Sequence, residues 1–481
     1  MRLMRSGIMS PAIKVVSLLV LIMGLEATSD EQLFSHSMLY SSKTRYEQSR
    51  MLFQKFSSYV RLPGHEIIRN IDSIKSHPAG CEPDQLSLIL RHGSRYPSRS
   101  WMKQFPKMID RLANLDMKAE FSGLKTWLNP FDGEPSRLSR SGMDENAGIA
   151  RRYFNRFSKV FKTALLSQNL EVIVSSRQRT GDSAKAFLTS LSQLLHLDQD
   201  NFASMLAARD DLTCFYKNCP AHSNQVELEK RTNFSEYNLF LEGSEIRQVV
   251  QRVSKRLSLT GNADLLTLDD ISAMWMACRM ETALCADNCT SPWCKIFTTD
   301  DSAVLEYASD LQGYWQESYG YPINYEQSCP LLADIVNNSL AMDQDSSSAS
   351  LSLYFGHSET LNPLLAILGL FKDESPLLAS NYELHRENRK FRQSFMGSFA
   401  SNLGFVRYKC EKGNQSSNSD WPSQLDTSMI QLIFNEHIIP FPFTKKAAIS
   451  FDEFLRDYHR YIYHCNFDQL CGLSKIGHEE L

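Results

Sequence analysis

The segment Arg91-His92-Gly93-Ser94-Arg95-Tyr96-Pro97 places two guanidinium groups and one imidazole close together in the chain. Guanidinium groups carry a permanent positive charge and several N–H donors, so a pair of them can hold a phosphate or a similar oxyanion. They also disfavour protonation of a neighbouring imidazole, which leaves one ring nitrogen free as a nucleophile. A solvated basic turn would explain Arg91-His92-Gly93 alone. The segment therefore predicts a phosphate site only if other parts of the chain contribute to it.

Two further apolar runs of the chain are followed by cationic or imidazole residues. Arg179 lies shortly after Leu170–Val174, and His357 lies shortly after Leu351–Phe355. In α/β sheets, ligands bind beyond the carboxyl ends of the strands, where helix N-termini also point. We therefore predict that the ends of these strands converge with the first segment on one oxyanion.

Phosphoryl transfer to a histidine is the chemistry that these residues predict. His92 is the expected nucleophile, and its attack on phosphorus would give a phosphohistidine intermediate. The leaving alkoxide needs a proton, which Glu359 can donate before it takes a proton from the hydrolytic water. The charge on the phosphoryl oxygens requires fixed donors, and the residues predicted to bind phosphate are Arg91, Arg95, Arg179 and His357. This chemistry requires no metal ion or other cofactor, and the sequence has no carboxylate cluster that suggests a metal site.

Alternating strands and helices position these residues in the predicted fold. A strand over Gln85–Leu90 leads into the first segment, because leucines alternate along it. Further strands are predicted at Leu170–Val174, Leu351–Phe355 and Ser428–Phe434. Helices are predicted from Ser139 or Ser141 to Ala164, from Ala184 to Leu194, from Leu361 to Phe371, and from the capping box at Ser450 towards Cys465. The sequence thus indicates an α/β fold with a central mixed sheet flanked by helices.

The chain of 481 residues is long enough for two or three domains, or for one large domain with an insertion. Residues 200–340 lose clear strand signals, so we predict a mainly helical second domain inserted at 196–340. The α/β domain then comprises residues 28–195 and 341–477. The formal net charge of −4 argues against nucleic acid as the main partner, so the predicted anion site must be local.

Both ends of the sequence resemble targeting signals. Basic residues precede the apolar run Val15–Leu25, which is too short to span a bilayer comfortably. We therefore predict a signal peptide over residues 1–27, with a signal anchor as the alternative, and no transmembrane segment in the mature chain. The tail at 478–481, His-Glu-Glu-Leu, resembles the KDEL and HDEL retention addresses, with a random tail as the alternative. These signals predict the lumen of the endoplasmic reticulum, with secretion also open.

All 11 cysteines follow the predicted signal peptide, as in chains oxidised in the secretory pathway. Their odd number leaves at least one thiol unpaired or in an intermolecular bond. Cys285, Cys289 and Cys294 form a loose cluster that could bind zinc, although disulfides are the favoured interpretation in an oxidising compartment. Glycosylation sequons, which fit the same route, begin at Asn233, Asn288, Asn337 and Asn414.

These segments together resemble a histidine acid phosphatase of the histidine phosphatase superfamily (clade 2), whose signature is R-H-G-x-R-x-P with a distal H-D or H-A-E. Arg179-Thr180, followed by Ser183 and Phe187, is similar to the family's third-arginine segment. Gly356-His357-Ser358-Glu359 resembles the H-A-E form of the multiple inositol-polyphosphate phosphatase branch. Ser358 stands where that branch usually has alanine, and its hydroxyl could bond either Glu359 or the phosphate. Further similar stretches are Ser42–Tyr46, Ser291–Cys294, Tyr319–Tyr321 and Arg389–Arg392.

The resemblance implies hydrolysis of inositol hexakisphosphate and other inositol polyphosphates. It also implies removal of the 3-phosphate of 2,3-bisphosphoglycerate, and disulfides that join Cys81 to Cys410 and Cys465 to Cys471. Alternatives are a secreted acid phosphatase of broad specificity, an enzyme similar to phosphoglycerate mutase, and a non-catalytic anion-binding protein. Basic residues that could hold further phosphates, or else form a solvated helix face, are Arg386, Arg389, Lys390 and Arg392.

Overall fold

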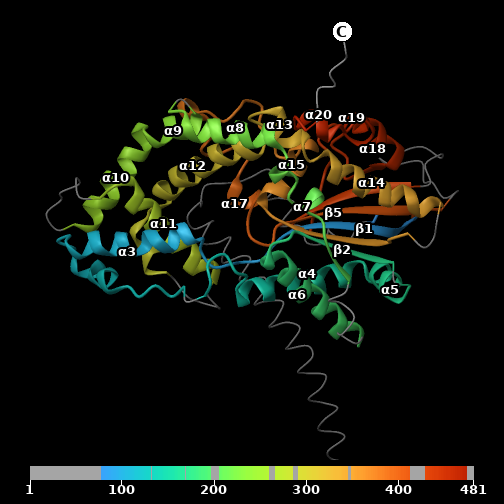
Figure 1. Ribbon diagram of the computed structural model, residues 1–481, viewed down its shortest axis with the longest axis horizontal. Helices are drawn as coiled ribbons and strands as arrows, with labels where there is room; N and C mark the ends of the chain where they lie inside the picture. The colour runs from blue at the N-terminus through green and yellow to red at the C-terminus, as the bar shows by residue number, and fades with distance from the viewer. Residues whose placement is uncertain are drawn as a thin grey trace, which may run out of the picture. The chain divides into compact units, whose positions relative to one another are not determined.

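A mixed sheet of eight strands is the centre of the part of the chain that the structure describes (Figure 1). Seven strands lie in the order β3-β2-β4-β1-β5-β6-β7, and β8 pairs with β6. Neighbours among β1 to β4 are parallel, whereas the pairs that involve β5 to β8 are antiparallel. The strands are β1 (Cys81–Arg91), β2 (Leu170–Val174), β3 (Leu206–Ala208), β4 (Leu351–Gly356), β5 (Asn402–Cys410), β6 (Ser428–Phe434), β7 (His437–Ile439) and β8 (Ala448–Ser450). The predicted central mixed sheet is confirmed.

This computed structural model describes residues 77–131, 133–167, 169–196, 205–233, 235–258, 266–284, 291–344, 348–411 and 428–473. The predicted signal peptide, the tail at 478–481, and Cys285 and Cys289 lie outside these residues, as do the sequons at Asn288 and Asn414. Within the described ranges, no helix is both long enough and apolar enough to cross a membrane.

The parallel register brings the three predicted site segments to one edge of the sheet. Arg91 lies opposite Gly356 in the pair of β1 and β4, and Val174 lies opposite Phe355 in the pair of β2 and β4. The loops that follow β1, β2 and β4 therefore begin side by side. The predicted convergence of these strand ends is confirmed.

Side chains that alternate along β1 pack against different helices on the two faces of the sheet. Leu86, Leu88 and Leu90 belong to an apolar cluster with residues of α4, α5 and α6, whereas Ile89 belongs to a cluster with residues of α14, α15 and α18. Figure 1 shows the first group of helices below the sheet and the second group above it. Their bounds are α4 (Arg140–Arg156), α5 (Ser158–Leu166), α6 (Gln178–Leu195), α14 (Cys329–Gln344), α15 (Ser358–Ile367) and α18 (Phe451–Asp457).

Several predicted helices differ from the observed ones in their bounds. The helix predicted from Ser450 towards Cys465 is two helices, α18 and α19 (His459–Tyr463), which are separated at Tyr458 (φ −107°, ψ 13°). The helix predicted through Ala164 is interrupted at Phe157 (φ −122°, ψ 38°), so α4 and α5 are separate. Periodicity did not reveal this break, because buried apolar residues continue on both sides of it. The helix predicted to end at Phe371 ends at Ile367, because Gly369 (φ 75°) and Phe371 (φ 58°) adopt left-handed backbone conformations that an α-helix excludes.

Strand β5 was not predicted, because charged residues and a glycine interrupt its apolar pattern. Arg407 is buried within this strand, and its guanidinium forms ion pairs of 3.0 Å with Asp84 and 2.7 Å with Asp343. These partners lie far away in the sequence, so the pattern alone made Arg407 resemble a loop residue. Strands β3, β7 and β8 were not predicted either, because they are too short to show a period.

Residues 196–340, which were predicted to form an inserted helical domain, contain β3 and a series of helices. The last of these helices, α14, extends beyond residue 340. Helix α3 (Arg99–Ala113), which precedes this segment, packs on α11 (Leu268–Leu284). The helices between β3 and β4 that precede α14 are α7 (Asp210–Thr213), α8 (Pro220–Arg231), α9 (Glu236–Leu241), α10 (Ser244–Leu257), α11 (Leu268–Leu284), α12 (Thr299–Glu317) and α13 (Pro322–Glu326). The other helices are α3 (Arg99–Ala113), α16 (Tyr382–His385), α17 (Gln393–Met396), α19 (His459–Tyr463) and α20 (Phe467–Leu470).

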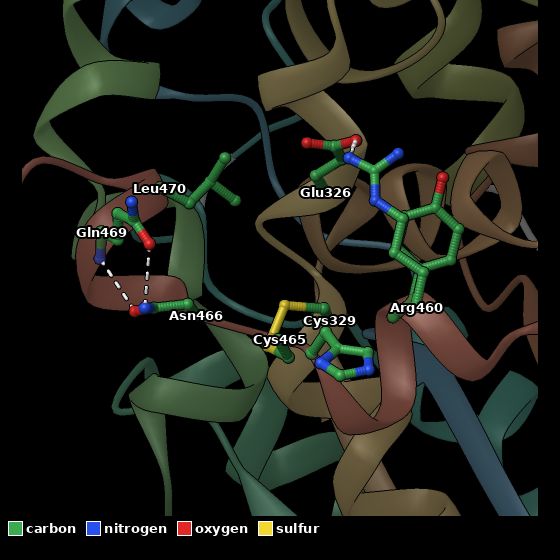
Figure 2. Close-up of a pocket in the computed structure, with 9 residues that line it drawn as sticks. Glu326, Cys329, Arg460, Cys465, Asn466, Gln469 and Leu470 are labelled. Carbon is green, nitrogen blue, oxygen red and sulfur yellow. Dashed lines mark hydrogen bonds and ion pairs between the residues drawn. A yellow bond between two sulfur atoms is a disulfide. The ribbon is translucent and has the colours of Figure 1, made fainter.

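Three disulfides of the described chain join segments that lie far apart in the sequence. The bond between Cys81 and Cys410 is confirmed. The implied bond between Cys465 and Cys471 is wrong, because Cys465 pairs with Cys329 (Figure 2) and Cys471 pairs with Cys219. Helix α19 (His459–Tyr463) packs on α14, which brings Cys465, two residues after α19, to Cys329, the first residue of α14.

The disulfide of Cys294 excludes this residue from a zinc site. Cys294 forms a disulfide with Cys278, and the described residues contain no cluster of three or more metal-ligating side chains. Cys214 is buried and is the free cysteine among the described residues.

Candidate active site

His92 follows the last residue of β1, and only 2% of its surface is exposed. Its Nδ1 lies 2.9 Å from the carbonyl oxygen of Gly93. Because a carbonyl oxygen only accepts hydrogen bonds, Nδ1 carries the proton of the neutral imidazole and Nε2 carries the lone pair. Burial, together with the charges of Arg91 and Arg179, lowers the pKa of His92 well below its usual value. Nε2 is therefore an unprotonated nucleophile even in mildly acidic solution.

Hydrogen bonds to two helices fix the loop that follows His92. The backbone N–H of Gly93 donates to Ser183 Oγ of α6 at 3.1 Å. Ser94 donates from its backbone N–H and from its hydroxyl to the two carboxylate oxygens of Glu145 in α4, at 2.8 and 2.6 Å. The position of the nucleophile is thus set by the helices that cover one face of the sheet.

Arg91 and Arg95 share an aromatic platform. Their guanidinium carbons lie 4.5 and 5.8 Å from the centre of the Phe399 ring. Arg91 also donates to the carbonyl oxygen of Gly397, and Arg95 donates to that of Tyr96. Burial lowers the pKa of both arginines to about 10, so both remain charged at neutral and acidic pH.

The three arginines of the site have unused hydrogen-bond donors. Among the described residues, none accepts a hydrogen bond from the buried Nε of Arg91, Arg95 or Arg179. After burial, the charges of Arg91 and Arg179 are the next causes of the lowered pKa of Arg95, so the guanidiniums also repel one another. An anion that accepts from these donors would relieve both penalties. The cluster can therefore bind a tetrahedral oxyanion beside Nε2 of His92.

Arg179 and His357 are joined by a hydrogen bond of 3.2 Å between Nη2 and Nδ1. A guanidinium only donates, so Nδ1 of His357 accepts and its Nε2 carries the ring proton. This Nε2 lies 2.9 Å from Ser175 Oγ. Burial and the charge of Arg179 lower the pKa of His357 to about 3, which keeps the ring neutral. In this structure His357 therefore supports Arg179.

Glu359 lies in the first turn of α15. Ser358 Oγ donates to Glu359 Oε2 at 2.8 Å, which is one of the two alternatives that the sequence left open for this hydroxyl. Burial favours the protonated carboxyl, but the backbone N–H of Glu359, the neighbouring His357, the hydroxyl of Ser358 and the charge of Arg91 together lower the pKa of Glu359. The carboxyl is therefore ionised near neutral pH in the ligand-free protein.

A second carboxyl group, at Glu317 in the last turn of α12, interacts with the first. Asn362, one turn after Glu359 on α15, donates to Glu317 Oε2 at 2.8 Å. Burial and the charge of Glu359 raise the pKa of Glu317 to about 8. At neutral pH this pair of carboxyl groups thus holds one proton, which resides on Glu317.

The structure brings together the residues that the sequence predicted for the site, which are Arg91, His92, Arg95, Arg179, His357 and Glu359. Sequence reasoning missed Ser175, Glu317 and Phe399. Ser175 directly follows β2, so a polar residue at the end of a predicted strand was an available signal. Phe399 gave no signal, because it lies in a loop that reaches Arg91 only through the pairing of β5 with β1.

The basic run in the sequence is divided between the surface and the core: Lys390 is exposed and Arg386 is partly exposed, whereas Arg389 and Arg392 are buried. Arg389 is fully buried and forms ion pairs of 2.8 Å with Glu306 and 2.5 Å with Asp310. Arg392 pairs with the same Glu306 carboxylate at 2.7 Å. Both arginines are therefore engaged in a buried ion-pair network, and neither is free to hold a substrate phosphate.

A surface hollow of about 330 Å³ lies beside the disulfide between Cys329 and Cys465 (Figure 2). Arg460 and Glu326 border it and form an ion pair of 2.7 Å. None of the predicted site residues lines this hollow. The candidate site is defined by the convergence of strand ends and not by this hollow.

Comparison with known sequences identifies relatives over most of the chain. Residues 84–435 match the profile of the histidine phosphatase superfamily (branch 2). The chain is 32% identical over 407 residues to multiple inositol polyphosphate phosphatase 1 of Gallus gallus, and the match covers 83% of this chain and 86% of that protein. It is 31% identical over 419 residues to multiple inositol polyphosphate phosphatase 1 of Homo sapiens, with 82% and 83% covered.

Solved structures share the fold. A Bifidobacterium longum multiple inositol polyphosphate phosphatase in complex with inositol hexasulfate superposes with a TM-score of 0.64 at 15% identity, over 80% of this chain and 94% of that chain. The phytase from D. castellii superposes with a TM-score of 0.61 at 18% identity, over 82% and 83% of the two chains.

Proposed function

Because the chain belongs to the histidine phosphatase superfamily (branch 2), we propose that it hydrolyses inositol polyphosphates, including inositol hexakisphosphate, as a phosphoric monoester hydrolase. The relatives named multiple inositol polyphosphate phosphatase 1 match more than four-fifths of the chain and support this substrate class. The observation that carries the proposal is the unprotonated Nε2 of His92 beside three arginines with unused buried donors. This arrangement provides a nucleophile and a binding site for a phosphoryl group.

In the first half of the reaction, Nε2 of His92 attacks phosphorus and forms an N–P bond while the bond from phosphorus to the ester oxygen breaks. Arg91, Arg95 and Arg179 hold the charge on the phosphoryl oxygens. Glu359 gives its proton to the departing alkoxide. A bound phosphate places negative charge beside Glu359 and engages Arg91, and both effects raise the proton affinity of this carboxyl.

In the second half, water attacks the phosphohistidine. Glu359, now ionised, takes a proton from this water, the N–P bond breaks, and inorganic phosphate leaves with His92 in its original state. The same residues can remove the 3-phosphate of 2,3-bisphosphoglycerate, since each step requires only a phosphate monoester and no feature of the inositol ring.

Release of inorganic phosphate from inositol hexakisphosphate tests the proposal. We expect the purified protein to release phosphate progressively, and we expect His92→Ala to lose turnover while its circular dichroism spectrum stays unchanged. An enzyme similar to phosphoglycerate mutase would release almost no phosphate. A broad acid phosphatase would instead show a higher kcat/KM on nitrophenyl phosphate than on inositol hexakisphosphate. Retention of turnover by His92→Ala would exclude the phosphohistidine route.

The described disulfides support a lumenal or secreted location, because such bonds persist in oxidising compartments. The finer assignment to the endoplasmic reticulum remains a prediction from the sequence at 478–481. Deletion of these four residues tests it. Retention predicts that the truncated protein appears in the culture medium while the full chain stays in the cell, and equal amounts of both in the medium would contradict it.

A further inference from the structure

We propose that Ser175 is a positioning residue of this reaction: its hydroxyl fixes the hydrogen bonding of His357, and His357 in turn aims Arg179 at the phosphate. The inference rests on the proposed phosphatase function and adds a residue outside the segments at 91–97 and 356–359. Ser175 directly follows β2 and is 2% exposed.

The hydrogens around the Ser175 hydroxyl follow from the groups that can only donate or only accept. Thr180 Oγ1 lies 3.0 Å from the Ser175 carbonyl oxygen and 2.7 Å from that of Arg177, so the Thr180 hydroxyl donates to one of them. Thr180 Oγ1 then accepts from Ser175 Oγ, 2.9 Å away. Ser175 Oγ itself accepts from the backbone N–H of Arg177 at 3.3 Å and from Nε2–H of His357 at 2.9 Å.

His357 transmits this constraint to Arg179. Because the ring proton stays on the Ser175 side, Nδ1 presents a lone pair to Nη2 of Arg179 at 3.2 Å. His357 itself is fixed, since its backbone N–H donates to Thr360 Oγ1 at 3.0 Å. A guanidinium held at one nitrogen keeps its remaining donors in a defined direction, and catalysis depends on such pre-set donors. The Nε of Arg179 is among these remaining donors.

Substitution of Ser175 by alanine and by cysteine tests the proposal, with Ser190→Ala as the matched control. Ser190 is a comparably buried hydroxyl on the same helix as Arg179, and it donates to the carbonyl oxygen of Ala147 at 3.0 Å. For each variant, the inhibition constant of inorganic phosphate, kcat on nitrophenyl phosphate and Tm are measured. We expect both Ser175 variants to raise the inhibition constant about 10-fold and to lower kcat. Ser190→Ala should change neither, and the cysteine variant excludes an effect of lost volume.

A double-mutant cycle with Arg179→Ala separates positioning from a structural role. Because Ser175 acts through Arg179, Ser175→Ala should change the phosphate inhibition constant by less than about 2-fold when Arg179 is already absent. An equal loss in both backgrounds, an unchanged inhibition constant, or a loss restricted to temperatures near a lowered Tm would overturn the proposal. A wild-type protein that neither releases nor binds phosphate would overturn the proposed function as well. If the wild type is active and the Ser175 variants match it, only the role proposed for Ser175 is overturned.

Discussion

The backbones of Gly93 and Gly142 lie in direct contact, and this contact seats the loop of the nucleophile on the first turn of α4. A Cβ at position 93 would lie 2.6 Å from the Cα of Gly142, and a Cβ at position 142 would lie 2.7 Å from the backbone nitrogen of Ser94. Neither position can accept a side chain unless the backbone moves.

We therefore expect Gly142→Ala to displace the loop that carries His92. Such overpacking destabilises folded proteins by about 1–3 kcal/mol, and displacement of the nucleophile should reduce kcat by at least about 10-fold. Phosphate release and Tm measure the two effects. Gly123→Ala is the control, because a Cβ there meets no atom within 4 Å. An active Gly142→Ala with an unchanged Tm would show that the loop tolerates the shift.

Glu359→Gln should discriminate between leaving groups. An inositol alkoxide needs a proton as it departs, whereas nitrophenolate is stable without one. We expect kcat on inositol hexakisphosphate to fall about 100-fold or more and kcat on nitrophenyl phosphate to fall only a few-fold. The ratio of the two losses is the measured quantity, and equal losses on both substrates would remove Glu359 from the role of proton donor.

Phe399→Leu should weaken phosphate binding, because the Phe399 ring lies beside Arg91 and Arg95 as well as the ring of His92. The substitution keeps an apolar residue but removes the ring that lies 4.5 Å from the guanidinium of Arg91. Cation–π contacts of this kind contribute about 0.5–2 kcal/mol, so the inhibition constant of inorganic phosphate should rise between about 2-fold and 30-fold. The exposed Phe443 provides a control through Phe443→Leu. Equal phosphate affinity in Phe399→Leu and the wild type would contradict a role for the ring.

Glu317→Gln should change how stability depends on pH. The pKa of Glu317 is raised to about 8 in the folded protein, against an ordinary value of 4.5. Between these two pH values the folded chain binds more protons than the unfolded chain at this group, so its contribution to the free energy of unfolding falls as pH rises from about 4.5 to about 8. Urea unfolding of wild type and variant across this range measures the difference. The difference in the free energy of unfolding should shift in favour of the variant as pH rises. If the curves of wild type and variant against pH stay parallel, Glu317 does not hold a buried proton.

The sequence predicted those residues of the site that lie close in the chain to a recognisable strand. A basic or imidazole side chain directly after a buried apolar run marks a strand end, and parallel strands then bring Arg91, Arg179 and His357 together. The placement of Phe399 could not be predicted in this way. It depends on β5, whose apolar pattern the charge of Arg407 disrupts, and on the loop before β5, where the N–H of Ala400 donates to the carbonyl oxygen of His92 at 3.1 Å.

The roles of charged residues were also hidden where their partners lie far along the chain. Arg389 and Arg392 form a basic run in the sequence, yet Glu306 and Asp310 of α12 neutralise them in the core. The burial of a charge is set by the fold around it, and periodicity contains no information about a distant counter-ion. In the same way, the pairing of Cys465 followed from the packing of α19 on α14 and not from its neighbour in the sequence.

The positions of the cysteines in the chain also determine when each disulfide can form during biosynthesis. A ribosome that makes the chain from its N-terminus releases Cys81, Cys219 and Cys329 long before their partners, which lie 329, 252 and 136 residues later. Among the described bonds, only Cys278–Cys294, with a separation of 16 residues, can close soon after synthesis. The early thiols therefore wait together in reduced form and are free to form wrong pairs, which thiol–disulfide exchange must resolve. Since β1 pairs with β4 and β5, which both follow it late in the chain, we expect the nascent chain to lack phosphatase activity until these two strands have been made.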